Sequence, residues 1–276
     1  MPPLFWVDII GLAASTFIAG SLTLLVAGVD PGNRVNRSFG YFTGTMAMWM
    51  GAALLLRISL WLGPVLPPGL FLPNTYLWLL LGSISLLLMC IASLMFTATY
   101  LDCRTRLTDS AIAFGLLLSI ALFVRSLLSP WTTIPDIHLS TNGLITYEMS
   151  ITAKVGLVLS TLYILVSVIL FQRERHRIET KYFSLSFMIL LVGIIFRTFV
   201  HAPFPVYSFS NALCALMLAY GVINRQMLNP LKVRTMELHK RTALPFIDPS
   251  DGFIHGSKCL HFPWDVFCFG VDFTHP

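Results

Sequence analysis

Charged residues are scarce in this chain of 276 residues. Asp, Glu, Lys and Arg together make up 11% of it, whereas a soluble domain typically carries about 25%. Hydrophobic residues make up 56%, and the mean hydropathy is +0.77. This balance indicates an integral membrane protein. The length is sufficient for seven spans of about 20 residues with short connections, and it leaves little for a second domain.

Motifs for metal binding and redox chemistry are also lacking. The five cysteines contain no CxxC pair and no spacing typical of metal ligands. Cys90 and Cys214 lie inside apolar segments, where a thiol packs as a small hydrophobic group. The histidines and cysteines near the C-terminus are irregularly spaced: His255, Cys259, His261, Cys268 and His275. We therefore expect no metal site and no cofactor.

Long apolar segments are what the chain does contain. Seven of them can be drawn, over residues 5–28, 38–62, 75–100, 108–128, 151–171, 182–200 and 206–223. Each is long enough to cross the hydrocarbon core as a helix, so the sequence predicts an all-α integral membrane protein. We read the connection GPVLPPGLFLPN as a loop. The longest connection contains the Asn142-Gly143 pair between IHLS and LITY, which predicts a short β-hairpin.

Basic residues predict the orientation of these helices. Lys and Arg cluster after the first, third, fifth and seventh segments: Arg34 and Arg37; Arg104 and Arg106; Arg173, Arg175, Arg177 and Lys181; Arg225, Lys232, Arg234, Lys240 and Arg241. Such residues stay on the cytoplasmic side of a membrane. We therefore predict that residues 1–224 form a seven-helix membrane domain with the N-terminus outside and the C-terminus inside.

Four basic residues depart from this pattern because they lie inside apolar segments near the predicted outer end: Arg57, Arg125, Lys154 and Arg197. A rise of 1.5 Å per residue places each within about 8 Å of that boundary. His201 follows Arg197 by one helical turn. The four cations therefore share a depth although they belong to four different helices.

Two interpretations of these cations remain open. Each cation can extend to the nearby interface beside its own helix end. Alternatively, some of them converge on a cavity that opens outward, where they bind a small anionic ligand or pair with Asp8, Asp136 or Glu148. Arg57 and Arg197 are the strongest candidates because apolar residues flank both of them. We expect deeper polar residues to serve as contacts between packed helices.

Several membrane functions are disfavoured by the residues that the spans lack. No Asp or Glu lies in the middle of a span, which argues against a proton pump or a cation-coupled carrier. The seventh span has no Lys for a retinal Schiff base, and no paired carboxylates or clustered histidines suggest a membrane-embedded enzyme. A small multi-pass transporter or channel stays as the alternative, although no polar path through the centre is evident.

The segment after the seventh span predicts an output element. Residues 225–244 are basic, and Leu228, Leu231 and Leu238 form a short heptad-like stripe. A juxtamembrane helix of this kind could transmit movement to a cytoplasmic domain, or it could simply anchor to lipid. The remaining residues, 245–276, show no clear period, and we expect them to form an irregular, disordered tail.

Two segments resemble a known family of membrane receptors. The stretch NRVNRSFGYFTGTMAMW enters the second span, and NALCALMLAYGVINRQMLNP covers the seventh span and its exit. Together with the topology, they resemble the seven-transmembrane N-terminal sensor region of bacterial histidine kinases over residues 1–242. The resemblance implies a multi-pass protein of the cell inner (plasma) membrane. It also implies signal sensing that controls a C-terminal effector, usually a kinase.

The chain departs from complete receptors of that family in its C-terminal part. A kinase requires a phosphoacceptor box and an ATP-binding domain, and His239 in ELHKRT lacks the acidic residue and the proline of such a box. We therefore expect a signal-sensing module without its own kinase activity. As partners we expect the lipid bilayer, a small anionic ligand on the outer side, a second copy of the chain and a cytoplasmic signalling effector. We expect no nucleic acid.

Overall fold

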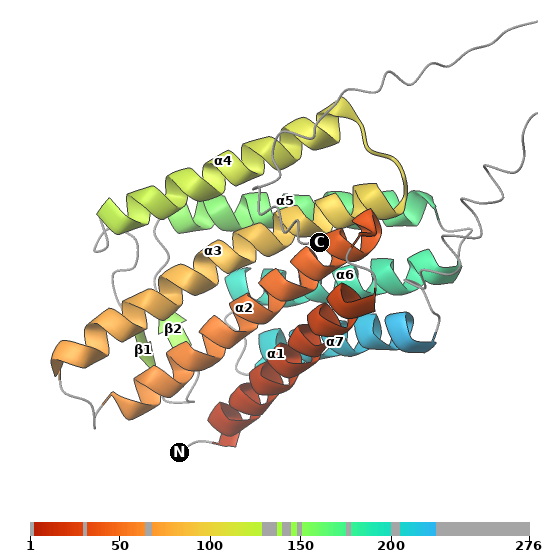
Figure 1. Ribbon diagram of the computed structural model, residues 1–276. Helices are drawn as coiled ribbons and strands as arrows, with labels where there is room; N and C mark the ends of the chain where they lie inside the picture. The colour runs from red at the N-terminus through yellow and green to blue at the C-terminus, as the bar shows by residue number, and fades with distance from the viewer. Residues whose placement is uncertain are drawn as a thin grey trace, which may run out of the picture. The chain divides into compact units, whose positions relative to one another are not determined.

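The computed structural model describes residues 3–29, 32–63, 68–128, 137–139, 145–147, 151–174, 178–199 and 205–224. Within these ranges the chain forms seven α-helices and one two-stranded sheet (Figure 1). The helices are α1 (Pro3–Val29), α2 (Arg34–Leu62), α3 (Pro68–Tyr100), α4 (Arg106–Leu128), α5 (Ile151–Arg173), α6 (Ile178–Phe199) and α7 (Val206–Asn224). Each of the seven predicted apolar segments is therefore helical.

Six of these helices (α1, α2, α3, α4, α5 and α7) are long and apolar enough to cross a membrane. In α6 the apolar part, Thr180–Phe196, is shorter. Large apolar side chains are exposed along the helices, among them Phe17 (76%) and Leu24 (77%) of α1. A soluble protein rarely exposes contiguous apolar surface of this kind, so the helices are those of a multi-pass membrane protein.

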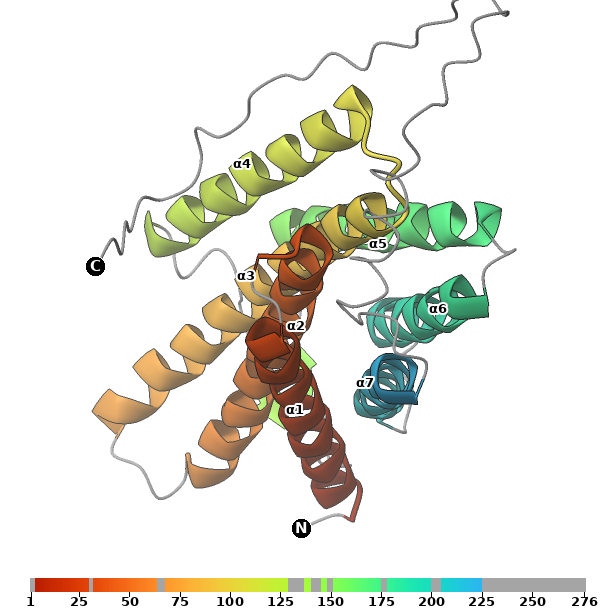
Figure 2. The same cartoon turned by 45° about the vertical axis from the view of Figure 1, so that its right-hand side comes forward.

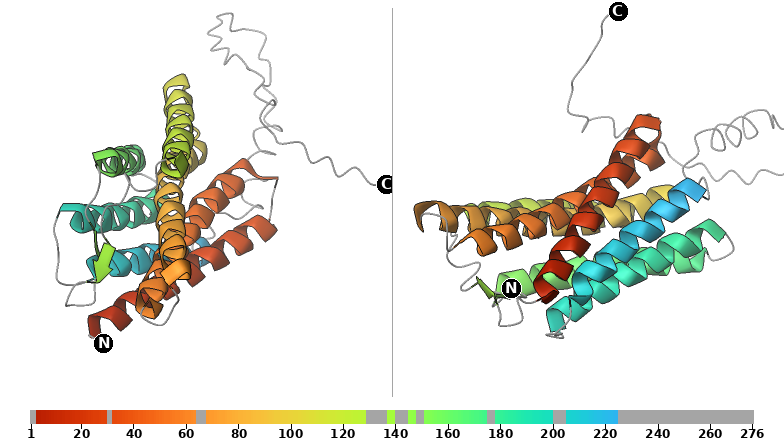
Figure 3. Two further views of the ribbon diagram at one scale, coloured as in Figure 1. Left: turned by 90° about the vertical axis from the view of Figure 1, so that its left-hand side faces the viewer. Right: turned by 90° about the horizontal axis from the view of Figure 1, so that it is seen from below.

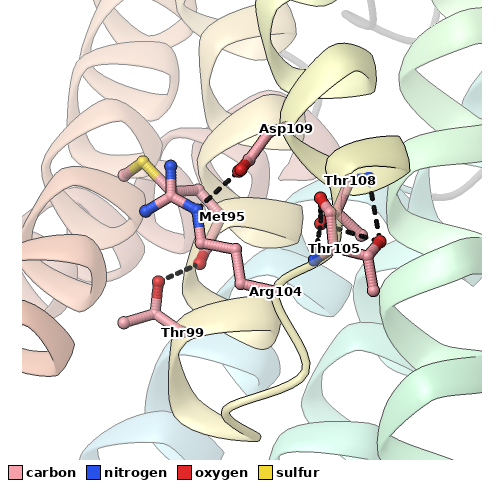
Figure 4. Close-up of polar contacts among 6 residues, drawn as sticks. All are labelled: Met95, Thr99, Arg104, Thr105, Thr108 and Asp109. Carbon is pink, nitrogen blue, oxygen red and sulfur yellow. Dashed lines mark hydrogen bonds and ion pairs between the residues drawn. The ribbon is translucent and has the colours of Figure 1, made fainter. Parts of the chain in front are cut away.

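Local polar contacts define the ends of two helices. Asn33 precedes α2, and its side chain accepts a hydrogen bond of 2.8 Å from the backbone N–H of Val35, as an N-cap does. Thr105 and Thr108 exchange hydrogen bonds at the start of α4, while Arg104 pairs with Asp109 at 2.5 Å (Figure 4). These contacts fix the short turn between α3 and α4.

One predicted loop is wrong in part. The connection GPVLPPGLFLPN was expected to lie outside the helices, but α3 already begins at Pro68. Proline is tolerated in the first turn of a helix because its missing N–H has no partner there. The helix is therefore longer than the apolar segment that predicted it.

Six helices close into a ring. Going round it, α1 packs against α2, α2 against α3, α3 against α5, α5 against α6, α6 against α7, and α7 again against α1. The fourth helix, α4, packs against α3 and lies at the periphery, as two views of the ribbon show (Figures 1 and 2). The hydroxyl of Tyr163 on α5 also donates a hydrogen bond of 2.6 Å to the carbonyl of Ala111 on α4.

Aromatic side chains fill the middle of this ring near one end. Six phenylalanines from α2, α3, α5 and α6 are almost fully buried: Phe39, Phe42, Phe96, Phe171, Phe183 and Phe187. Some of their rings meet edge to face, for example Phe96 with Phe183 at 5.0 Å between centroids, and others stack, as Phe171 does with Phe183. The edge-to-face geometry is favoured by the quadrupoles of the rings. The cluster lies at the end of the helices where the basic connections begin.

The predicted hairpin is confirmed in its strands. The strand β1 (Ile137–Leu139) pairs antiparallel with β2 (Ile145–Tyr147), with His138 opposite Thr146. The Asn142-Gly143 turn lies outside the described residues, as do the exit segment 225–244 with its leucine stripe and the tail 245–276.

Candidate functional site

Arg57 makes a buried ion pair. It lies on α2 with 6% of its surface exposed, and its Nε donates a hydrogen bond to Oδ2 of Asp8 on α1, which is 2% exposed. Its Nη1 donates a second hydrogen bond, of 3.0 Å, to the carbonyl of Ala53. Of the three carboxylates considered from the sequence, Asp8 is therefore a partner of Arg57.

A third helix joins this pair through Ser208 of α7. Its hydroxyl, which is fully buried, lies 2.6 Å from Oδ1 of Asp8 and donates to it. Both oxygens of the Asp8 carboxylate are thus hydrogen-bonded, each by a different helix. We refer to Asp8, Arg57 and Ser208 as the three-helix cluster.

A glycine lets the helices approach closely at this cluster. Gly11 lies one turn after Asp8 on α1, and a Cβ atom placed there would be 3.1 Å from Cβ of Ser208. That separation is tighter than ordinary van der Waals contact, so a larger residue would move α7 away from α1. The right-hand panel of Figure 3, seen from below, shows α1 beside α7, in agreement with their contacts.

The cluster lies near one end of the helical bundle. Asp8 is five residues after the start of α1, Arg57 five before the end of α2, and Ser208 two after the start of α7. At 1.5 Å per residue these positions are about 8, 8 and 3 Å from the helix ends. This is the end that the basic connections predict to be outside. We call it the predicted outer end.

Two indole rings lie still closer to that end. Trp6 of α1 and Trp61 of α2 meet edge to face with 5.9 Å between their centroids. They are 45% and 39% exposed, respectively. Tryptophan is enriched where the apolar core of a membrane meets the headgroups, so this pair fits an interfacial position just beyond the three-helix cluster.

The ion pair in the three-helix cluster is much more buried than the exposed pair at the α3–α4 turn. The two charged side chains are 7% and 3% exposed, whereas the other ion pair between described residues, Arg104–Asp109, is 56% and 47% exposed. A buried charge is stable only when it is paired and hydrogen-bonded. Each member of the cluster therefore depends on the other two helices keeping their positions. Displacement of any of the three helices would break at least one of these hydrogen bonds.

An unsatisfied amide lies one turn deeper. Asn211 of α7 follows Ser208 by three residues, which places both on the same face of the helix. Its side chain is fully buried, and neither Nδ2 nor Oδ1 has a hydrogen-bond partner among the residues that the structure describes. Sequence reasoning treated such polar residues as contacts between helices, and for Asn211 no such contact is seen in the described part.

The remaining predicted site residues do not join the cluster where they are described. Arg125 on α4 and Lys154 on α5 are exposed, as expected for cations that reach an interface. Arg197 belongs to α6, but its side chain and all of His201 lie outside the described residues. The structure thus brings Arg57 to Asp8 and Ser208, and an anion site that includes the other cations stays a prediction.

At the opposite end, Cys103 lies in the turn after α3, next to Asp102 with its left-handed backbone (φ 53°). Burial raises the pKa of the Cys103 thiol, and the negative charges of Glu174 and Asp102 raise it further, while a backbone hydrogen bond offsets part of the change. The thiol is therefore a weak nucleophile at neutral pH.

Similarity to known proteins does not indicate a function for this chain. The chain matches no protein-family model and no curated protein sequence.

Proposed function

We propose that this chain is a membrane-embedded signal-sensing module that receives a signal at its outer end and passes it inward through α7. The observation that carries the proposal is the three-helix cluster. It ties Asp8 of α1 and Arg57 of α2 to Ser208, which stands at the start of the helix that leads into residues 225–244. The helix that contacts the proposed ligand-responsive cluster would thus be the same helix that leads to the cytoplasmic segment.

The proposal takes all seven helices as spans with the N-terminus outside. The apolar part of α6, Thr180–Phe196, extends about 26 Å at 1.5 Å per residue, and a somewhat short span of this kind is accommodated by local thinning of the bilayer. The alternating basic connections support the orientation. The three-helix cluster then lies in the outer part of the membrane, and the buried phenylalanines lie in the inner part.

A signal would act by changing the stability of the cluster. A small anion that binds near Arg57 would compete with Asp8, and α7 would lose one of its contacts with α1. Such coupling requires two states that differ in their affinity for the ligand. The resemblance to sensor regions of histidine kinases supports a cytoplasmic signalling effector as the partner that reads the position of α7.

Spin-label distances in the full chain test this coupling without a known ligand. Labels would be attached at Ile223, near the inner end of α7, and at Leu107, at the start of α4, since both side chains are exposed. In lipid nanodiscs, Asp8→Asn and Arg57→Gln should each shift or broaden the distance distribution. Gly20→Ala should leave it unchanged, because nothing lies within 4 Å of a Cβ atom at that position of α1.

One outcome would contradict this coupling. Distributions that are identical in the wild type and in both cluster variants, in protein that remains folded, would overturn the coupling. Solute uptake by proteoliposomes that contain the purified chain would instead favour the alternative of a small transporter or channel.

A further inference from the structure

The amide of Asn211 requires a partner that the described protein groups do not supply. Its side chain is fully buried, and both of its polar atoms lack hydrogen bonds within the described ranges. Buried carboxamides are almost always satisfied, either by protein or by ordered water. The amide presents a donor and an acceptor side by side, so a single partner that satisfies both must itself donate and accept.

The neighbouring helix offers a second polar group at the matching position. The two helices run in the same direction, since Asp8 near the start of α1 meets Ser208 near the start of α7. Gly11 faces Ser208. One turn further along, these positions become Ser15 on α1 and Asn211 on α7, and both side chains are fully buried.

Ser15 retains the capacity to accept a hydrogen bond. Its hydroxyl donates to the carbonyls of Gly11 at 2.8 Å and Leu12 at 3.0 Å, which uses its proton but leaves its oxygen lone pairs. Between α1 and α7, Ser15 thus offers an acceptor, and Asn211 offers both donors and an acceptor.

We propose that a water molecule is held between α1 and α7 at the level of Asn211, where it bridges the carboxamide to Ser15. Water is the species that both donates and accepts without bringing a charge, and internal water commonly joins two or more buried polar groups. A lone anion would satisfy only the amide N–H groups and a lone cation only the amide oxygen, whereas water can satisfy both. The site lies one turn deeper than the three-helix cluster and is independent of any signalling role.

Infrared spectroscopy of the full chain tests this hydration directly. With asparagine isotopically labelled, the difference between the wild type and Asn211→Leu isolates the amide band of residue 211. We expect a hydrogen-bonded frequency that shifts after transfer to D2O, because the bound water exchanges and carries deuterium to the amide. Ser210→Ala, at the adjacent position of α7, is the matched control and should not remove the band.

A second measurement avoids reliance on the variant. A high-resolution experimental structure of the wild-type chain in lipid should contain a water-sized density within hydrogen-bond reach of a polar atom of the Asn211 carboxamide and of the Ser15 hydroxyl. A band that does not shift in D2O, a non-hydrogen-bonded frequency, or an amide satisfied by protein atoms or by a larger molecule would each overturn the proposal.

Discussion

Arg57 and Asp8 neutralise each other inside the protein instead of each reaching for water. Both side chains are buried, so removing one of them lowers the free energy of unfolding more than it would in an ion pair on the surface. Removal of one partner leaves the other charge without compensation, whereas an exposed ion pair contributes little.

Asp8→Asn should therefore destabilise the membrane domain strongly. We expect a loss of about 3–5 kcal/mol in the free energy of unfolding, which is typical when one partner of a buried pair is removed. The loss would be measured by thermal or denaturant unfolding of the purified full chain in detergent. Asp109→Asn, in the exposed pair, should cost about 0–1 kcal/mol.

The double variant Asp8→Asn, Arg57→Gln makes this prediction stricter. It removes both charges together, so its loss should be smaller than the sum of the two single losses. Strictly additive losses would contradict a direct interaction between the two side chains.

Cys103 gives a pH-dependent prediction at the same scale. A raised pKa means a smaller thiolate fraction at any given pH, and the thiolate is the nucleophile. Alkylation by iodoacetamide should therefore accelerate at higher pH than for an ordinary thiol. Glu174→Gln removes a negative charge that raises this pKa, so it should speed alkylation at a fixed pH.

This experiment uses the full chain with Cys259→Ser and Cys268→Ser, so that the tail thiols do not contribute. Cys90 and Cys214 are fully buried and serve as unreactive internal references. Equal rates in the Glu174→Gln variant and its parent would show that the carboxylate does not influence the thiol.

At the scale of helices, α6 and α7 pack through a glycine. A Cβ atom at Gly193 would lie 2.8 Å from Cβ of Ser210 and 1.8 Å from its Oγ. The hydroxyl can rotate away, but the Cβ atom cannot. The small residue therefore permits the close approach that small side chains give to membrane helices.

Gly193→Ala should separate α6 from α7 and lower the thermal stability of the solubilised protein. Ser210→Gly in the same chain removes the clashing atoms and should restore much of the loss. Gly20→Ala is the control, because nothing lies within 4 Å of a Cβ atom at that position. A double variant no more stable than Gly193→Ala would argue against this contact.

The helices themselves could be predicted from the sequence, because long apolar runs leave few alternatives in a membrane. The three-helix cluster could be predicted from the sequence only in part. Arg57 is recognisable from its apolar flanks, but its partner Asp8 is 49 residues away and Ser208 is 200 residues from Asp8. Such pairings depend on how helices pack, and no local pattern encodes them. Asn211 carries a weak signal, its three-residue spacing from Ser208, which becomes informative only once the burial of both is known.

At the scale of the whole molecule, the order of helices round the ring is also a result of packing. The chain passes from α3 to α4, yet α3 contacts α5 within the ring while α4 stays outside it. Sequence order alone favours neighbouring helices as spatial neighbours. The buried aromatic side chains on α2, α3, α5 and α6 supply a reason for the observed arrangement, since their large rings pack together.

The predicted orientation can be tested on the intact protein in membranes. In the variant that lacks the tail thiols, a membrane-impermeant maleimide should label Cys103 in inverted vesicles and not in intact cells. A cysteine introduced at Trp61, which is partly exposed near the end of α2, should show the opposite behaviour. Labelling of Cys103 from outside intact cells would reverse the topology.

The ion pair also bears on how the protein is made. Asp8 and Arg57 belong to the first two helices, so the ribosome completes both partners long before it reaches α7. Each charge alone would oppose entry into the lipid, but α1 and α2 can enter as a hairpin whose charges cancel. Ser208 then arrives last and docks onto a carboxylate that is already in place. If the helices insert in the order of the chain, the Asp8–Arg57 pair would lower the cost of moving α1 and α2 into the lipid together.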